Sequence, residues 1–359
     1  MRTIGYAAYS PDTPLAPYEF ERRELRPNDV AMEILYCGVC HSDLHTARND
    51  WGGSYYPIVP GHEIVGRVIA VGPEVTGHKV GDHVAVGCLV DSCMSCDQCD
   101  HGEEQLCRNR STFTYGARDR ITREFTQGGY SRHLVVREEF CLRVPQGLDL
   151  ARAAPLLCAG ITTYSPLRTW NVGPGSRVGV IGLGGLGHMA VKLAVGMGAD
   201  VTVLSRSADK EPDALALGAH RLLVSSDEAA MEAAADTFDL IIDTVPVRHD
   251  LTPYVPLLDI DGTIVIVGQV GPIDETSTIP LVMGRRRIAG SLIGGIRETQ
   301  EMLDFCAEKN ILPDCEMIRM DQINEAFERM EKADVRYRFV IDMATLSQPS
   351  AAPTTPARR

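Results

Sequence analysis

The feature that most constrains the fold is a glycine-rich turn that joins an apolar run to a helical pattern. The run at 177–181 is typical of a buried strand, and it leads directly into a G-x-G-x-x-G pattern. In this pattern the first glycine permits a tight turn, the second lets a pyrophosphate approach the backbone, and the third lets helix and strand pack closely. The helix N-terminus then faces the anion. A purely structural turn is the alternative. The pattern predicts a dinucleotide site whose turn consists of Gly182, Leu183, Gly184, Gly185, Leu186 and Gly187.

Strands and helices alternate along the chain around this turn. Apolar strands are expected at 200–204, 239–243 and 262–267, and helices at 185–197 and near 210–217. This alternation is typical of a doubly wound parallel sheet with helices on both faces.

The flanking segments have a different character. The first ~149 residues contain short strands, such as 30–35 and 63–71, separated by Gly, Pro and Asp. After residue 298 two amphipathic helices, 299–309 and 322–332, precede a strand at 338–342 that we expect to return to the first domain.

Length and charge limit the class of protein. A chain of 359 residues suggests two domains. The formal net charge of −13 disfavours nucleic acid or an anionic membrane as partner, because both require a basic patch. No apolar run is long enough to span a membrane, and the N-terminus lacks a signal-peptide pattern. We therefore expect a cytoplasmic protein.

Four of the 11 cysteines are crowded into one short segment with the spacing C-x2-C-x2-C-x7-C. Zinc favours thiolates in tetrahedral geometry, and this spacing lets the thiolates converge on one ion. Because no coordination position stays open, the site would be structural. An iron–sulfur cluster and four unrelated thiols are weaker alternatives, and the acidity of the loop disfavours a nucleic-acid zinc ribbon. The predicted ligands are Cys93, Cys96, Cys99 and Cys107.

A second set of metal ligands is spread along the chain. Cys40, His62 and Cys158 each stand in a segment where a lone cysteine or histidine is more often buried filler. Together they suggest a Cys/His/Cys trio with a fourth position free for water or substrate.

These segments, in this order, resemble the zinc-containing medium-chain alcohol dehydrogenases. Within this family the chain is most similar to the cinnamyl-alcohol dehydrogenase-like branch. In that branch it resembles the bacterial NADP-dependent aldehyde reductases of broad specificity. The resemblance covers roughly residues 5 to 345. The segments that carry it are 40–43, 61–63, the four-cysteine segment, Cys158, the glycine turn, 90–93, 127–130, 155–167, 293–296 and 298–306.

The resemblance implies roles for individual residues. Cys40, His62 and Cys158 would hold a catalytic zinc, and Glu63 matches a position that can approach the metal as an alternative ligand. Asp43 matches a carboxylate that orients a ligand histidine, which we take to be His62. The remaining implied roles belong to Ser42, which would bind the substrate oxygen, to His45, the outer member of a proton relay, and to Thr162, near the nicotinamide.

The chemistry of the residues agrees with these roles. Zinc polarises a carbonyl, and the oxygen must gain a proton after hydride delivery. Ser42 is two residues from a ligand, and His45 is three residues further along an expected helical turn, where it can exchange protons with solvent. A local cap at Ser42 and a surface His45 are the alternative. Trp51 and Tyr55 follow and are expected to line an apolar substrate pocket, unless they only pack the loop.

The end of the second expected strand indicates which coenzyme is bound. NAD-preferring domains place Asp or Glu there to accept hydrogen bonds from the ribose 2′-hydroxyl. Here the strand ends in hydroxyls and cations, so the sequence predicts NADP(H); a solvated basic turn is the alternative. The predicted 2′-phosphate residues are Ser205, Arg206, Ser207 and Lys210.

We therefore predict an α/β chain with a GroES-like, β-rich catalytic domain at 1–149 and 295–359, whose tail at 347–359 is disordered. A Rossmann domain would span 150–294. The predicted activity is hydride transfer between NADP(H) and an alcohol/aldehyde pair, with two zinc ions per chain. A relative reducing another electrophile, such as an iminium, and a zinc-buffering or nucleic-acid-binding protein are the alternatives. We also expect a homodimer through the strand at 287–293.

Overall fold

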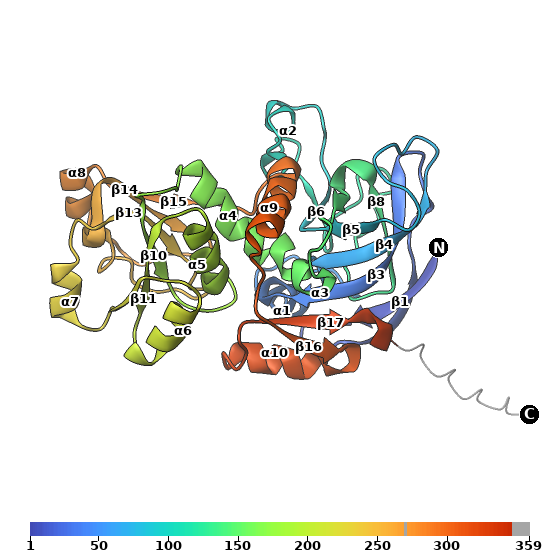
Figure 1. Cartoon of the computed structure of the whole chain (residues 1–359). Coiled ribbons are helices and arrows are strands. Elements are labelled where there is room, and N and C mark those ends of the chain that lie inside the picture. The colour runs from blue at the N-terminus through green and yellow to red at the C-terminus, as the bar shows by residue number, and fades with distance from the viewer. Residues whose placement is uncertain (269–270, 347–359) are drawn as a thin grey trace, which may run out of the picture.

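The computed structural model describes residues 1–268 and 271–346, so the predicted disordered tail at 347–359 lies outside the described residues. The chain forms two sheet-based halves side by side, with α9 (Ile296–Lys309) and α4 (Ala159–Thr169) between them (Figure 1). No helix in the described part of the chain is both long and apolar enough to cross a membrane.

The predicted parallel sheet is present. It has six strands in the order β12-β11-β10-β13-β14-β15, and every adjacent pair is parallel. Its strands are β10 (Arg177–Ile181), β11 (Asp200–Ser205), β12 (Arg221–Val224), β13 (Phe238–Asp243), β14 (Leu258–Ile266) and β15 (Arg287–Gly290). Its helices are α5 (Gly187–Gly196), α6 (Glu211–Ala216), α7 (Glu228–Ala233) and α8 (Ile279–Gly284). This confirms the Rossmann-type architecture.

A seven-stranded, mostly antiparallel sheet forms the other half, in the order β16-β17-β3-β4-β5-β9 with β8 also paired to β3. Its strands are β3 (Asp29–Val39), β4 (Ile64–Val71), β5 (His83–Val86), β8 (His133–Arg137), β9 (Leu142–Arg143), β16 (Cys315–Arg319) and β17 (Arg338–Asp342). Because β17 is antiparallel to β3, the C-terminal segment lies on the sheet built by the N-terminal residues.

Smaller elements complete this half. Two hairpin-like pairs are β1 (Arg2–Ala7) with β2 (Ala16–Glu21), and β6 (Leu89–Asp91) with β7 (Thr112–Phe113). The helices are α1 (His41–Arg48), α2 (Asp97–Asp100), α3 (Leu150–Ala153) and α10 (Ile323–Glu331).

Helix α4 connects the cores of the two halves. Nine consecutive residues, 159–167, are buried, which is typical of a helix enclosed by the protein on all sides. Ile161, Tyr164 and Leu167 belong to one hydrophobic cluster that includes Val65 of β4 and Val180 of β10. The segment just before α4 is therefore fixed at the junction of the two sheets.

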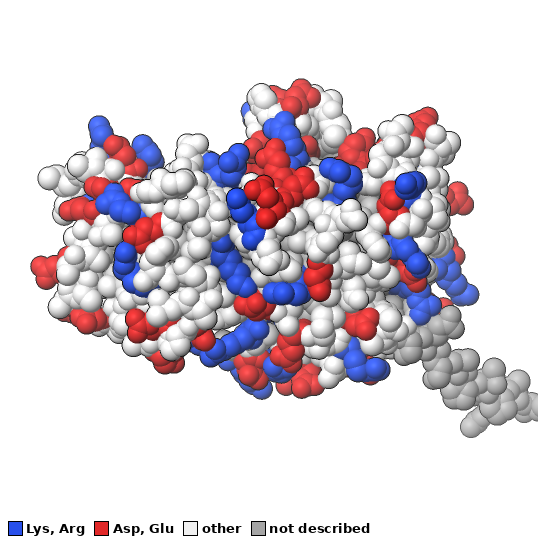
Figure 2. All heavy atoms as spheres, viewed as in Figure 1, with Lys and Arg blue, Asp and Glu red and all other residues white. Residues whose placement is uncertain are grey.

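Charges of both signs are mixed over the face in Figure 2, and acidic side chains gather over α9, whose sequence includes Glu298, Glu301, Asp304 and Glu308. No continuous basic patch covers this face of the described residues.

Candidate active site and metal centres

Four potential metal ligands from distant parts of the chain meet at the junction of the two halves. The ligand atoms of Cys40, His62, Glu63 and Cys158 all lie within 4.8 Å of one another, and all four residues are buried. Cys40 caps the N-terminus of α1, His62 and Glu63 immediately precede β4, and Cys158 caps α4. The Sγ atoms of Cys40 and Cys158 are 3.8 Å apart across 118 positions of sequence. Two thiols and an imidazole suit zinc.

Asp43 positions two of these ligands. Its fully buried carboxylate accepts hydrogen bonds from the backbone N–H of Cys40 (2.9 Å) and lies 3.2 Å from Nδ1 of His62. Because Nδ1 of His62 faces Asp43 and the Tyr115 hydroxyl (2.9 Å), Nε2 is the nitrogen available to a metal. Tyr130 also donates to Asp43, at 2.8 Å. Burial raises the pKa of both tyrosines, so their hydroxyls stay protonated.

Glu63 has an additional partner that links the metal ligands to the glycine turn. Arg338, at the start of β17, donates to Oε1 of Glu63, and both side chains are buried. Burial raises the pKa of the Glu63 carboxyl, and the Arg338 charge acts in the opposite direction. Oε2 of Glu63 has no hydrogen-bond partner, which leaves a carboxylate oxygen free beside Cys40 and His62. A Cβ on Gly185 would lie 2.9 Å from Nη1 of Arg338, so this guanidinium also touches the glycine turn.

The second group of ligands lies in the lobe between β6 and β7. The Sγ atoms of Cys93, Cys96, Cys99 and Cys107 lie within 4.8 Å of one another. Neighbouring pairs are 3.6 Å apart (Cys96 to Cys99) and 3.9 Å apart (Cys93 to Cys99). All 11 cysteines lie in the described residues and are free thiols, so no disulfide competes for these sulfurs. The donor set fits a closed tetrahedral zinc site.

The expected proton relay starts at the first metal group. Ser42 Oγ is 3.7 Å from the sulfur of Cys40, and helix α1 carries both Ser42 and His45. Nδ1 of His45 pairs with Asp50 at 2.8 Å, which leaves Nε2 to exchange protons. Trp51 packs against His45, with ring centroids 5.1 Å apart.

Tyr55 lies apart from this group. It is 46% exposed and stacks on Phe125, with ring centroids 3.8 Å apart, while the Arg118 guanidinium covers the Phe125 ring at 4.1 Å. The structure therefore brings Trp51 to His45, whereas Tyr55 packs against the loop at 117–125.

The glycine turn has the geometry that a bound pyrophosphate requires. Gly182 has φ of 88°, in the region that favours glycine. A Cβ on Gly187 would lie 2.2 Å from the Gly182 carbonyl oxygen, so only glycine allows α5 to start so close to β10. Nothing lies within 4 Å of a Cβ position on Gly184, which leaves the backbone open on that side. Thr162 is buried in α4, one helical turn after Cys158, and its N–H donates to the Cys158 carbonyl at 2.9 Å.

Two family profiles match the chain. The alcohol dehydrogenase GroES-like domain matches residues 26–146, and the zinc-binding dehydrogenase domain matches residues 185–308. NADP-dependent alcohol dehydrogenase C 1 of Mycolicibacterium smegmatis is 55% identical over 348 residues, covering 96% of this chain and 99% of the relative. The chain belongs to the zinc-containing alcohol dehydrogenase family.

Further members of this family are similar along nearly the whole length. Aldehyde reductase YahK of Escherichia coli is 53% identical, with 97% of this chain and 100% of the relative covered. The cinnamyl alcohol dehydrogenase SbCAD4 of Sorghum bicolor has a TM-score of 0.93 and 46% identity, with 98% of this chain and 100% of that chain covered. A cinnamyl alcohol dehydrogenase of Helicobacter pylori, solved with NADP(H), has a TM-score of 0.88 and 40% identity, with 96% and 99% covered. These relatives confirm the predicted branch of the zinc alcohol dehydrogenases.

In this alcohol dehydrogenase the expected 2′-phosphate residues lie at the end of β11 and directly after it. Ser205 is the last residue of that strand, and Arg206, Ser207 and Lys210 are exposed. The Arg206 carbonyl accepts a hydrogen bond from Ser226 at 3.0 Å, which fixes the backbone of the turn. Among the described residues, the ion pairs include neither the Arg206 nor the Lys210 cation. Both are thus free to bind an anion.

Sequence reasoning missed Asp50 and Arg338, and it placed Tyr115 in the loop of the substrate pocket without its contact to His62. Asp50 lies five positions after His45, beyond the end of α1, a spacing that could have indicated the contact. Tyr115 and Arg338 reach the ligands from loops and strands far along the chain, and no local pattern marks them.

Proposed function

We propose that this protein is a zinc-dependent, NADP(H)-preferring alcohol dehydrogenase that mainly reduces aliphatic and aromatic aldehydes to primary alcohols. The observation that carries the proposal is the buried Cys40, His62 and Cys158 group, joined through Glu63 and Arg338 to a dinucleotide turn. The names of the relatives support the coenzyme and the direction of reaction.

Four residues of the chain have distinct roles in the proposed reaction. When bound, zinc supplies Lewis acidity that polarises a carbonyl, and NADPH supplies the hydride. Ser42 hydrogen-bonds the substrate oxygen and donates its proton to it. His45 returns a proton from solvent to Ser42, and Asp50 holds the His45 ring in the tautomer that keeps Nε2 available. Asp43 keeps Nε2 of His62 directed at the metal.

A steady-state screen tests this function. Aliphatic and aromatic aldehydes are supplied with NADPH or NADH, and coenzyme oxidation is followed. We expect aldehyde reduction with catalytic efficiency at least about tenfold higher with NADPH. Turnover confined to cyclic iminium substrates, or none with any aldehyde, would reject the proposal.

We also propose two zinc ions per chain, one catalytic and one structural. The two groups of converging soft ligands support this number. Elemental analysis of the purified protein should give about two zinc ions per chain, and a value near one or none would contradict it.

A homodimer is the assembly that we propose. Strand β15 is an edge of the six-stranded sheet, although it ends at Gly290 and is shorter than the predicted 287–293. The neighbouring helix α8 exposes Ile279, Val282 and Met283 by 72%, 73% and 81%. An open strand edge beside exposed apolar side chains favours pairing with a second copy. Light scattering that finds a monomer at micromolar concentration would reject the dimer.

The proposal also includes the domain limits: a catalytic domain at 1–149 and 295–359, and a Rossmann domain at 150–294. It further includes a cytoplasmic location. The free state of all the cysteines supports a reducing compartment. Fractionation of the native cells would test the location.

A further inference from the structure

A buried serine touches the four-cysteine group. Ser92 lies between β6 and the first cysteine of the group and is only 2% exposed. Its Oγ is 3.2 Å from Sγ of Cys99 and 3.0 Å from Sδ of Met94. It also accepts a hydrogen bond from the Met94 backbone N–H at 3.3 Å.

The Ser92 hydroxyl has one proton and two sulfur neighbours. A thioether is a neutral, weak acceptor, whereas a metal-bound thiolate is charged and accepts more strongly. The proton therefore goes to Cys99 once the metal site is formed. Cys99 is also one of the two buried members of the group, so it has little water to stabilise its charge.

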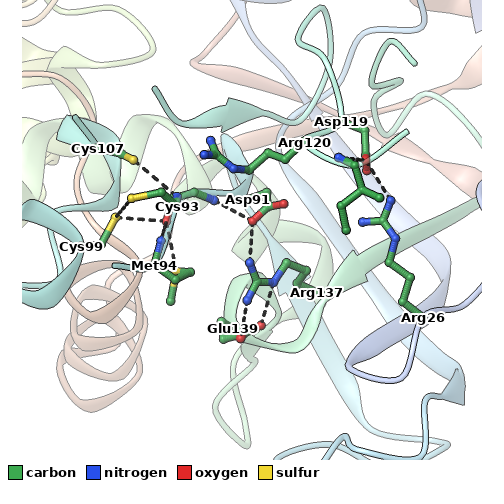
Figure 3. Close-up of polar contacts among 12 residues, drawn as sticks. Arg26, Asp91, Cys93, Met94, Cys99, Cys107, Asp119, Arg120, Arg137 and Glu139 are labelled. Atoms are coloured by element: carbon green, nitrogen blue, oxygen red, sulfur yellow. Dashed lines mark hydrogen bonds and ion pairs between the residues drawn. The ribbon is translucent and has the colours of Figure 1, made fainter. Parts of the chain in front are cut away.

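The position of Ser92 is fixed from outside the lobe. Oδ1 of Asp91 accepts the Ser92 backbone N–H at 2.8 Å and Nη1 of Arg137 at 2.7 Å. Arg137 is the last residue of β8, and its Nη2 and Nε donate to the Glu139 carboxylate at 2.7 and 3.2 Å. Figure 3 shows this series from Glu139 through Arg137 and Asp91 to the cysteines. The sheet thus holds the donor in place before the metal binds.

We propose that Ser92 is a positioning residue of the four-cysteine metal centre, whose hydroxyl donates to the Cys99 thiolate and slows loss of the metal. The inference rests on the structural zinc proposed above. Residues that hydrogen-bond metal ligands typically contribute about 10- to 100-fold to metal affinity.

The test compares two serines of the same lobe. Ser92→Ala removes the donor, while Ser95→Ala changes an exposed serine whose side chain is in none of the hydrogen bonds of the described residues. Zinc release to a chromogenic chelator is followed for both variants of the full chain. We expect release from the four-cysteine site to be about tenfold faster in Ser92→Ala and unchanged in Ser95→Ala.

A second readout separates this role from simple packing. With cobalt(II) in place of zinc, the thiolate-to-metal charge-transfer band should move to longer wavelength in Ser92→Ala, because the lost hydrogen bond raises the energy of the sulfur lone pairs. Release and spectrum that match the Ser95→Ala control would overturn the inference. If Ser92→Ala does not fold, Ser92→Gly replaces it: this variant also lacks the hydroxyl, so a band at longer wavelength supports the hydroxyl's role, and a wild-type band overturns it.

Failure of the structural zinc itself would look different. Wild-type protein would then carry no second zinc and would show no cobalt band typical of thiolate-only ligation. A normal wild-type band with an unaffected Ser92→Ala variant would reject only the role of Ser92.

Discussion

Glu63 and Arg338 form a buried ion pair although 275 positions separate them in the sequence. Glu63 stands beside the proposed catalytic ligands, and Arg338 touches the turn that is proposed to bind the coenzyme pyrophosphate. This one ion pair therefore connects the group of metal ligands to the glycine turn. It also attaches β17, the strand that brings the C-terminal segment back, to the segment before β4.

We expect Arg338→Met to destabilise the protein by about 3–5 kcal/mol, because it leaves a buried carboxylate that must stay uncompensated or take up a proton. The free energy of unfolding in urea measures the effect. The double change Arg338→Met with Glu63→Gln should recover part of the loss, since it removes both charges.

The control for this pair is Arg285→Ala, which breaks an ion pair with Asp261 in which Arg285 is 74% exposed. Exposed pairs contribute about 0–1 kcal/mol. If Arg338→Met and Arg285→Ala lower the free energy of unfolding equally, the buried pair contributes no more to stability than the exposed one.

The four-cysteine group should behave as part of the folded structure. Cys96→Ser removes one of four ligands, and because structural zinc binding contributes to folding, zinc content and stability should fall together. We expect about one zinc per chain in place of two, with a lower Tm. Elemental analysis and thermal unfolding measure both. Cys315→Ser, at a thiol outside both metal groups, is the matched control, and a Cys96→Ser protein with full metal and normal Tm would exclude the structural site.

Features that depend on residues close together in the sequence could be predicted from it. The glycine turn and the cysteine lobe each lie within about fifteen residues, so their geometry follows from the backbone that those residues can adopt. The catalytic ligands are dispersed, so their residue types suggest a zinc trio only in combination, and the resemblance of their flanking motifs to a known family adds the role of each residue. Arg338 and Tyr115 act through tertiary contacts, which no periodicity reports.

Two predicted boundaries and one missed strand differ from the structure for physical reasons. Strand β14 starts at Leu258, before the predicted 262, because a register shift against β13 accommodates polar Asp259 and Asp261. Strand β12 escaped prediction because it is a four-residue edge strand without fully buried positions. The α9 helix starts at Ile296 rather than 299, where the Glu104 carboxylate accepts the Ile296 N–H at 2.8 Å.

Ser42→Ala should lower turnover by roughly 10²–10⁴-fold, the typical contribution of positioned proton transfer. His45→Gln should have a much smaller effect, because water can partly replace the outer member of the relay. Steady-state aldehyde reduction at saturating NADPH measures both. Ser54→Ala, which removes a hydroxyl that donates to the Thr46 carbonyl, should stay within about twofold, and a Ser42→Ala enzyme that does the same would exclude the relay.

A buried histidine should make stability depend on pH. Burial, with Lys192 nearby, lowers the pKa of His188 to about 3, whereas an unfolded histidine has a pKa of about 6.5. The unfolded chain therefore binds more protons between these values, so the stability is complete above pH 6.5 and falls as the pH drops towards 3. Between pH 7 and pH 5 the wild type should lose about 2 kcal/mol more than His188→Phe, which keeps the stacking on Tyr337. Urea unfolding at both pH values measures this. His83→Phe, at an exposed histidine, should lose as much stability between pH 7 and pH 5 as the wild type does. A His188→Phe protein whose free energy of unfolding falls as much as that of the wild type would contradict the prediction.

The coenzyme preference should depend on the turn after β11. Ser205→Asp places a carboxylate where it repels a 2′-phosphate and accepts hydrogen bonds from a ribose 2′-hydroxyl, so the preference for NADPH should shrink or reverse. Arg206→Ala should raise the KM for NADPH with little effect on NADH, because a hydrogen bond to a charged group contributes about 1.5–3 kcal/mol, roughly ten- to a hundredfold. Paired measurements of kcat/KM with NADPH and NADH test both variants.

Arg221→Ala provides the control, because this cation starts the neighbouring strand β12 and pairs with Asp200 at 2.9 Å, at the opposite end of β11 from Ser205. It should leave the ratio of the two efficiencies unchanged. Arg206 has no such carboxylate partner among the described residues, so its charge is available to the coenzyme. Equal efficiency with both coenzymes in the wild type, or an Arg206→Ala ratio identical to that of Arg221→Ala, would show that the turn does not recognise the 2′-phosphate.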